Sequence, residues 1–193
     1  MDKTEIINHL LGHSVCRRYL EVGSGVRDCF DRVQTGIKHD IEPNPPSGMR
    51  PTWRMTPDEA FASMGPAHEY DVVMIDGLHQ CDQVARDVLN ASHRLYKDGY
   101  IVLHDCIPRG EEMQVRVCPG AVSWMGDVWK FQTWLVERFP NVVTITDEEC
   151  GVGIVSGPIF YDIPPLEDLL RFEWKDFSLP RMRGIAWKDW MAS

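Results

Sequence analysis

Long hydrophobic runs and a surplus of basic residues are both missing from this 193-residue sequence. No apolar stretch approaches the roughly 20 residues that cross a bilayer, and no N-terminal stretch resembles a secretory signal. We therefore expect a cytoplasmic protein that makes no contact with a membrane. Lysine and arginine number 20 against 29 aspartates and glutamates, so the net charge is −9. Because this charge repels a phosphate backbone, nucleic acid is not expected as a partner.

Paired cysteines and the common catalytic signatures are missing as well. The six cysteines lie at positions 16, 29, 81, 106, 118 and 150, without the short spacing of zinc or thioredoxin-like sites. We expect them to be free thiols. The sequence also contains no nucleophile elbow, P-loop or zinc-protease motif, and this removes the commonest competing chemistries.

Strand and helix patterns alternate along the chain, which predicts βαβ units and a parallel sheet. β-prone runs occupy 18–22, 37–41, 70–75 and 100–103. Segments of helical period or with capping signals occupy 3–11, 27–34, 56–65, 80–96 and 128–139. We expect one doubly wound, Rossmann-like α/β domain over residues 1–193, with a mostly parallel sheet and an antiparallel last strand.

The core of this domain is expected at about 15–155, ending in two strands at 142–146 and 151–155 that form a hairpin. A long loop at 105–126 follows a strand end, where loops commonly form functional walls. Residues 158–193 form a C-terminal extension of unassigned structure. Its aromatic residues suggest a possible homo-oligomer, while the tryptophans near 124–130 are interpreted mainly as core packing.

Polar residues cluster at the carboxyl ends of the predicted strands, where open parallel sheets bind ligands. Gly23 and Gly25 allow close backbone approach, but the later glycine of a dinucleotide fingerprint is missing. Glu42 lies 21 residues after Glu21, where Rossmann-type folds place a carboxylate on the ribose hydroxyls. The plainer alternatives are glycines required by the turn alone and a solvated acid before a proline turn.

Four segments in order resemble the class I S-adenosylmethionine-dependent methyltransferases: YLEVGSG (19–25), IEPNP (41–45), YDVVMIDGLH (70–79) and LYKDGYIVLHDCIP (95–108). The most similar branch carries an IDGxH segment and an HD dipeptide, and it resembles small-molecule or sugar O-methyltransferases. The resemblance spans residues 15 to about 155. It implies S-adenosylmethionine as cofactor and a hydroxyl of a small molecule or sugar as methyl acceptor.

The resemblance also implies roles for individual residues at the cofactor. Glu42 is expected to hold the ribose, and Asp76 is expected to lie beside the cofactor amine and the substrate. Thr56 and Asp58 are expected near the adenine. The residues expected to border the methionine part are Glu21, Gly23, Ser24 and Gly25. Two rivals stay open. One is a nicotinamide- or nucleotide-binding oxidoreductase, and the other is a degenerate methyltransferase fold that serves as a binding protein.

Asp76 and Asp105 resemble the two aspartates that bind magnesium in catechol-type and related sugar O-methyltransferases. Two carboxylate oxygens suit Mg²⁺. However, Cys106 stands where an asparagine commonly follows, and a thiol is a poor ligand for a hard cation, so metal dependence stays open. His79 and His104 have an unperturbed pKa close to neutrality. His79 is the preferred general base because it follows Asp76 at the expected rim of the cleft, with His104 as the alternative.

Overall fold

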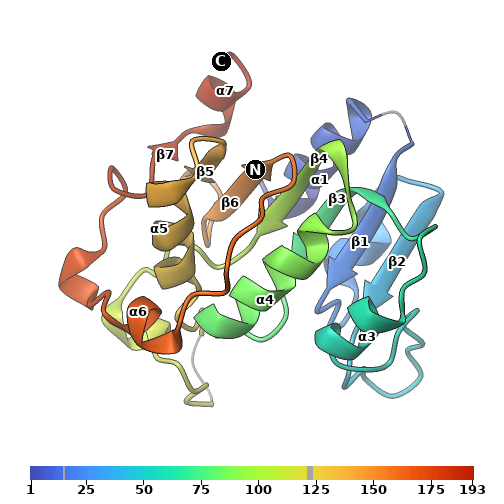
Figure 1. Cartoon of the computed structure of the whole chain (residues 1–193), viewed down its shortest axis with the longest axis horizontal. Helices are drawn as coiled ribbons and strands as arrows, with labels where there is room; N and C mark the ends of the chain where they lie inside the picture. The colour runs from blue at the N-terminus through green and yellow to red at the C-terminus, as the bar shows by residue number, and fades with distance from the viewer. Residues whose placement is uncertain (15, 121–123) are drawn as a thin grey trace.

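The computed structural model describes residues 1–14, 16–120 and 124–193, and its centre is a seven-stranded sheet in the order β2-β1-β3-β4-β6-β5-β7 (Figure 1). The parallel part contains β1 (Arg18–Val22), β2 (Ile37–Ile41), β3 (Tyr70–Ile75) and β4 (Leu95–Leu103). β6 (Val152–Ser156) is antiparallel to both of its neighbours, β4 and β5 (Val142–Ile145). The predicted α/β class and the hairpin are confirmed.

Helices cover both faces of the sheet, with α4 and α5 in front of it and α1 behind it in Figure 1. One face packs against α3 (Pro57–Ser63), α4 (Cys81–Ser92), α5 (Val128–Arg138) and α6 (Leu166–Leu170). The other packs against α1 (Lys3–Gly12), α2 (Asp28–Arg32) and α7 (Trp187–Trp190). No helix among the described residues is long and apolar enough to span a membrane.

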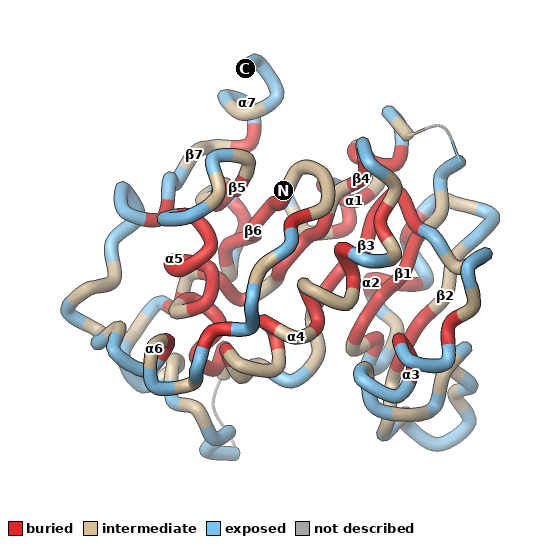
Figure 2. The backbone as a smooth tube through the Cα atoms, viewed as in Figure 1, coloured by how far each residue is buried: buried red, intermediate tan, exposed pale blue. Residues whose placement is uncertain are grey.

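Side-chain alternation along β3 explains the two layers. Val73 and Ile75 join the cluster under α4, while Val72 and Met74 join the cluster under α1. Every residue of β3 is buried, as a parallel strand covered on both faces requires. Figure 2 shows this buried backbone running through the strands and the inner helices.

The predicted boundary between the fourth helix and the following strand is wrong. Lys97 to Gly99 were expected to end a helix, but α4 ends at Ser92 and β4 already begins at Leu95. Gly99 lies so close to β3 that an added Cβ would be 2.7 Å from the carbonyl oxygen of Asp71. The glycine therefore permits a close strand contact at a shift of register, a tertiary feature that local helix-ending signals do not reveal.

Residues 158–193 extend the sheet and add one short helix to each helical layer, α6 on one face and α7 on the other. β7 (Gly184–Ile185) extends the sheet by pairing parallel with β5, and the 3₁₀ turn η2 (Trp174–Asp176) precedes it. The ring of Trp187 packs edge-on against His9 of α1, at 5.1 Å between centroids. These aromatic contacts lie within the chain, and the homo-oligomer stays a prediction.

Candidate active site

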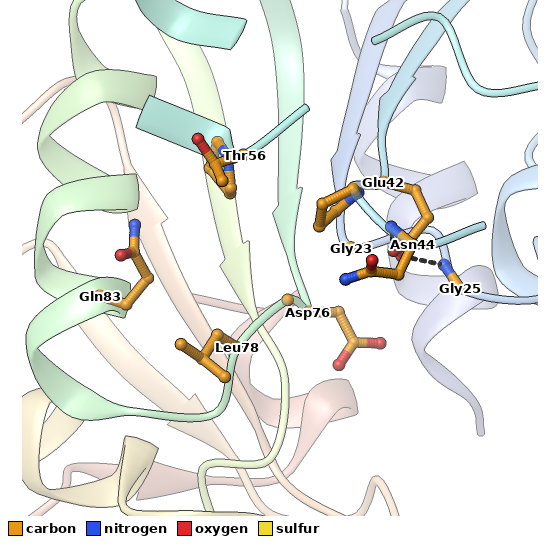
Figure 3. Close-up of a pocket in the computed structure, with 11 residues that line it drawn as sticks. Gly23, Gly25, Glu42, Asn44, Thr56, Asp76, Leu78 and Gln83 are labelled. Atoms are coloured by element: carbon orange, nitrogen blue, oxygen red, sulfur yellow. Dashed lines mark hydrogen bonds between the residues drawn. The ribbon is translucent and has the colours of Figure 1, made fainter. Parts of the chain in front are cut away.

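A cavity of about 490 Å³ opens where β1, β2 and β3 end, within the size range of small-molecule sites. It lies at the point where the strand order reverses, because β2 and β3 flank β1 on opposite sides. Figure 3 shows Leu78 and Gln83 on one side of it, facing Glu42 and Asn44 on the other. The lining residues are Gly23, Gly25, Glu42, Pro43, Asn44, Thr56, Pro57, Asp76, Gly77, Leu78 and Gln83.

The turn after β1 requires glycine at two positions, for different reasons. Gly23 has φ +85°, and an added Cβ would lie 2.3 Å from the backbone oxygen of Asp76, so a side chain would push apart the ends of β1 and β3. Gly25 has φ +49°, and its added Cβ would meet nothing within 4 Å. The backbone at Gly25 is therefore open to a ligand in the cavity.

Glu42 is held at the cavity wall by two backbone groups. Its Oε2 accepts a hydrogen bond from the N–H of Gly25 at 2.9 Å, which is dashed in Figure 3, and its Oε1 accepts one from the N–H of Asn44 at 2.8 Å. Each carboxylate oxygen can accept a further hydrogen bond. The geometry thus suits a ligand that offers two neighbouring hydroxyl groups.

Three residues that the sequence assigned to the cofactor do not line this cavity. Glu21 is buried and accepts a hydrogen bond from the Tyr19 hydroxyl at 2.7 Å, and burial raises the pKa of Glu21 to about 7. Ser24 donates to the buried Asp40 at 2.9 Å. Asp58 is half exposed and lies 3.5 Å from Arg86 of α4. Their partners, Tyr19, Asp40 and Arg86, do not line the cavity either.

Two polar lining residues, Asn44 and Gln83, were given no role by sequence reasoning. Asn44 lies inside the segment IEPNP (41–45), which carries part of the family resemblance, but only Glu42 of that segment was assigned to the cofactor. Gln83 lies in the first turn of α4, and its place opposite Glu42 depends on how that helix packs. No local sequence pattern marks Gln83 as part of a ligand site.

Behind Asp76 lies a set of ionisable residues that we call the charged cluster: Lys3, Asp76, His79, His104, Asp105 and Glu148. It joins the ends of β3 and β4 to the first turn of α1 and to the loop before β6. Asp76 belongs both to this cluster and to the cavity wall. Any chemistry of the cluster therefore reaches a ligand in the cavity through Asp76 or its immediate neighbours.

His79 faces two carboxylates of the charged cluster. Its Nε2 lies 3.2 Å from Asp105 Oδ2 and 3.5 Å from Asp76 Oδ1. Burial opposes a charge on the ring, but the hydrogen bond to Asp76 and the charges of Asp105 and Asp76 outweigh it and raise the pKa of His79. The imidazole also stacks on Trp124, at 5.0 Å between centroids and 21° between planes. Of the tryptophans expected in the core, Trp129 is buried, but Trp124 belongs to this site.

His104 contacts carboxylates through both ring nitrogens. Nδ1 lies 3.3 Å from both Asp76 and Asp105, and Nε2 lies 3.4 Å from Glu148. Burial disfavours the imidazolium, but these three carboxylates outweigh it and raise the pKa of His104 to about 12. The ring is therefore a cation at neutral pH, and a cation cannot accept a proton.

Asp105 and Cys106 are placed by the loop that follows β4. Asp105 has φ +58°, a left-handed conformation that is uncommon for a residue with a side chain. The hydrogen bonds from Cys106 N to Gly151 O (3.1 Å) and from Ile107 N to Cys150 O (2.8 Å) fix this turn. The Cys106 thiol is fully buried and faces backbone carbonyl oxygens, those of Leu103 at 3.6 Å and of His104 at 3.7 Å.

Lys3 and Glu148 were also missed by sequence reasoning. Lys3 Nζ lies 2.5 Å from Asp76 Oδ2, although the two residues are 73 positions apart. Glu148 accepts a hydrogen bond from Cys150 N at 2.8 Å, which orients it toward His104. No spacing rule links the start of an N-terminal helix, or a loop near the C-terminal strands, to the IDGLH segment.

Known proteins resemble this chain in sequence over one part and in fold over most of it. Residues 17–106 match a family described as a methyltransferase domain. No protein with a curated description matches the sequence. The fold is similar to an O-methyltransferase from Bacillus cereus in complex with SAH, at 12% identity and TM-score 0.56, covering 79% of this chain and 78% of that one.

Two further solved structures share the fold. TomG, an O-methyltransferase from Streptomyces achromogenes in complex with SAM, has 12% identity and TM-score 0.53 over 81% of this chain and 80% of its own. The N-methyltransferase NodS from Bradyrhizobium japonicum has 13% identity and TM-score 0.54 over 81% and 95%. At such identities the structures establish the fold, and the methyl acceptor is not decided by them.

Sequence family and fold agree on one assignment. The family match covers the glycine turn, Glu42, the IDGLH segment and the HD dipeptide, and the remaining strands complete the sheet of the same fold. This agreement speaks against the oxidoreductase rival, while a degenerate methyltransferase fold would give the same two matches. Residues 17–106 of this chain match a methyltransferase-domain family, and the chain has the fold of solved methyltransferases that bind SAM or SAH.

Proposed function

We propose that this methyltransferase methylates a hydroxyl group of a small molecule or sugar, with the cofactor in the cavity above the Gly23–Gly25 turn. The observation that carries the proposal is His79, a titratable imidazole held by two carboxylates directly behind the cavity wall formed by Asp76. A hydroxyl must lose a proton to become a good nucleophile, and an imidazole next to Asp76 supports a role as the group that accepts this proton.

We assign a separate role in binding or proton transfer to each of these residues. Glu42 accepts the ribose hydroxyls, and Thr56 lies at the adenine end of the cavity. The cofactor, when bound, supplies an electrophilic sulfonium methyl group. His79 takes the proton of the acceptor on Nδ1, and Asp105 and Asp76, which face Nε2, stabilise the imidazolium that forms. The enzyme otherwise contributes orientation of the two reactants.

Product analysis tests this function. The purified protein would be incubated with trideuteromethyl S-adenosylmethionine and a panel of phenols, catechols, sugars and amines, and the products analysed by mass spectrometry and NMR. We expect the label on oxygen. Transfer to nitrogen alone would refute the acceptor class while leaving the methyltransferase assignment unchanged.

Glu42→Ala is expected to weaken S-adenosylmethionine binding by about 10- to 100-fold, because hydrogen bonds to a charged group contribute about 1.5–3 kcal/mol. Titration calorimetry measures this. The matched control is Asp58→Ala, which removes an acid that faces Arg86 instead of the cavity and is expected to leave the affinity unchanged. A folded Glu42→Ala protein with normal affinity would remove Glu42 from the cofactor site.

The magnesium ion predicted at Asp76 and Asp105 does not fit the cluster as it stands. Asp76, His79 and Asp105 each offer a ligand atom, and these atoms lie within 4.8 Å of one another. However, the two carboxylates already contact an ammonium and two imidazoles, and Mg²⁺ prefers oxygen ligands. No step above depends on a metal.

Chelation decides between the two possibilities. We expect methyl transfer to continue in excess EDTA, because cationic side chains already neutralise the carboxylates. The measurement is the single-turnover rate with and without EDTA, followed by addition of Mg²⁺. A rate that disappears with EDTA and returns with Mg²⁺ would support the magnesium site instead.

A further inference from the structure

The first turn of α1 places an ammonium group in the charged cluster. Lys3 is the first residue of that helix, its side chain is 22% exposed, and its Nζ lies 2.5 Å from Asp76 Oδ2. Burial disfavours the ammonium, but the charge and hydrogen bond of Asp76 outweigh it and raise the pKa of Lys3 to about 12. Lys3 is therefore positively charged throughout the neutral pH range.

The needs of the helix do not explain a lysine at this position. The N-terminus of a helix carries a partial positive charge, which disfavours a cation in the first turn. Burying an ammonium also costs free energy unless a counter-ion accompanies it. Asp76 is that counter-ion, so the side chain is placed for its contact with the site.

The capping box and the buried apolar face of α1 hold the helix against the sheet, so the backbone of Lys3 has a fixed position. Asp2 and Glu5 form a complete capping box around the first turn. Ile6, Ile7 and other apolar residues of the helix are buried against the sheet. An ammonium on an anchored helix keeps a defined position, as a bound cation would.

The charges of the cluster balance without a metal. Asp76, Asp105 and Glu148 provide three negative charges, and Lys3 and His104 provide two positive ones. The remaining negative charge is matched once His79 has accepted the proton of the methyl acceptor. A divalent ion between Asp76 and Asp105 would add a surplus of positive charge beside a sulfonium cofactor, and it would compete with Lys3 for the Asp76 carboxylate.

We propose that Lys3 takes the place of a divalent cation in this site, as a positioning residue whose contact with the Asp76 carboxylate holds that carboxylate in place for His79. The inference rests on the proposed function. The chemistry balances without a metal: the acceptor oxygen forms a bond to the methyl carbon, the carbon–sulfur electron pair stays on the departing thioether, and the acceptor proton moves to His79 Nδ1.

The test compares three variants by Mn²⁺ binding and by single-turnover rate in excess EDTA. Lys3→Met removes the charge at similar length, Lys3→Arg keeps it, and Lys97→Met is the control because Lys97 is 89% exposed and far from the cluster. Mn²⁺ alone is the binding probe, followed by calorimetry. The rates use an oxygen acceptor found in the product panel.

We expect the wild type and Lys97→Met to keep their full rate in EDTA and to bind no Mn²⁺ at millimolar concentration. Lys3→Met should lose about 10- to 100-fold in rate, as when a supporting partner of a site is removed. It should bind Mn²⁺ and regain rate with it, because the Asp76 carboxylate is then free for a divalent ion. Lys3→Arg should keep most of the rate.

Stoichiometric Mn²⁺ binding to the wild type, or a wild-type rate that requires Mg²⁺, would overturn the role of Lys3 and leave the proposed function intact. Full activity of Lys3→Met in EDTA would overturn it too. The wild-type Mn²⁺ titration decides the question even if Lys3→Met does not fold. A wild type that methylates no oxygen acceptor would refute the proposed function itself.

Discussion

His79→Gln is expected to lower the single-turnover rate of methyl transfer by about 100- to 10,000-fold, the contribution of a general base. Glutamine keeps a polar side chain that can contact Asp76 and Asp105 but cannot accept the acceptor's proton. The affinity for S-adenosylmethionine should stay nearly unchanged, because Glu42 and the glycine turn line the cavity and His79 does not. Single-turnover kinetics isolates the chemical step from product release.

The pH profile provides an independent check on the same residue. Only the neutral imidazole accepts a proton, so the rate should rise with pH as His79 loses its charge. Because Asp76 and Asp105 raise the pKa of His79, the midpoint of the rise should lie above the ordinary histidine value. His93→Gln, at the end of α4, is the matched control and should leave the rate and the profile unchanged.

Two outcomes would contradict this role of His79. If His79→Gln turns over normally while His104→Gln binds cofactor but is inactive, the base is His104. If both variants keep the full rate and the wild-type pH profile, the proton goes to a carboxylate or another group. The cofactor site would be unaffected in either case.

Gly126→Ala is expected to lower the free energy of unfolding by roughly 2–4 kcal/mol and to reduce methyl transfer, although Gly126 is not itself a reacting group. Gly126 has φ +61°, and an added Cβ would lie 1.8 Å from the carbonyl oxygen of His79. That carbonyl accepts a hydrogen bond from Asp127 N at 3.1 Å. An alanine must therefore push the loop away from His79 and disturb the stacking of Trp124.

Gly48→Ala separates the two causes of this effect. Gly48 has φ +89°, but an added Cβ there would meet nothing within 4 Å, so the substitution measures the cost of a positive φ alone. We expect a loss of about 1 kcal/mol and an unchanged rate. Chemical denaturation and single-turnover kinetics on both variants give the comparison. Equal behaviour of the two would show that the close contact at His79 is unimportant.

The parallel half of the sheet and the cavity edge could be predicted because the signals are local. Buried runs such as 70–75 and the residues that end them lie next to each other in sequence, and the fold rule brings these ends together. Glu42 and Asp76 therefore appear at the cavity as predicted. The capping box at Thr56 likewise placed the start of α3 correctly.

The features that could not be predicted from the sequence depend on contacts between segments that lie far apart along the chain. Lys3 is positioned by the packing of α1, and Glu148 by the loop before β6. The end of α4 was mispredicted because Gly99 permits a close contact with the neighbouring strand β3 and does not mark the end of a helix. Asp58 was expected near the adenine because of its place in the sequence after β2. It faces Arg86 of α4 instead, and the sequence does not reveal that this arginine lies nearby.

A crystal structure of the protein with S-adenosylhomocysteine tests the placement of the cofactor site most directly. We expect the ribose hydroxyls within hydrogen-bond distance of both Glu42 oxygens, the backbone of Gly25 against the ligand, and the sulfur directed toward Asp76 and His79. A ligand that leaves Glu42 bonded only to Gly25 and Asn44, or whose sulfur lies away from the charged cluster, would contradict it.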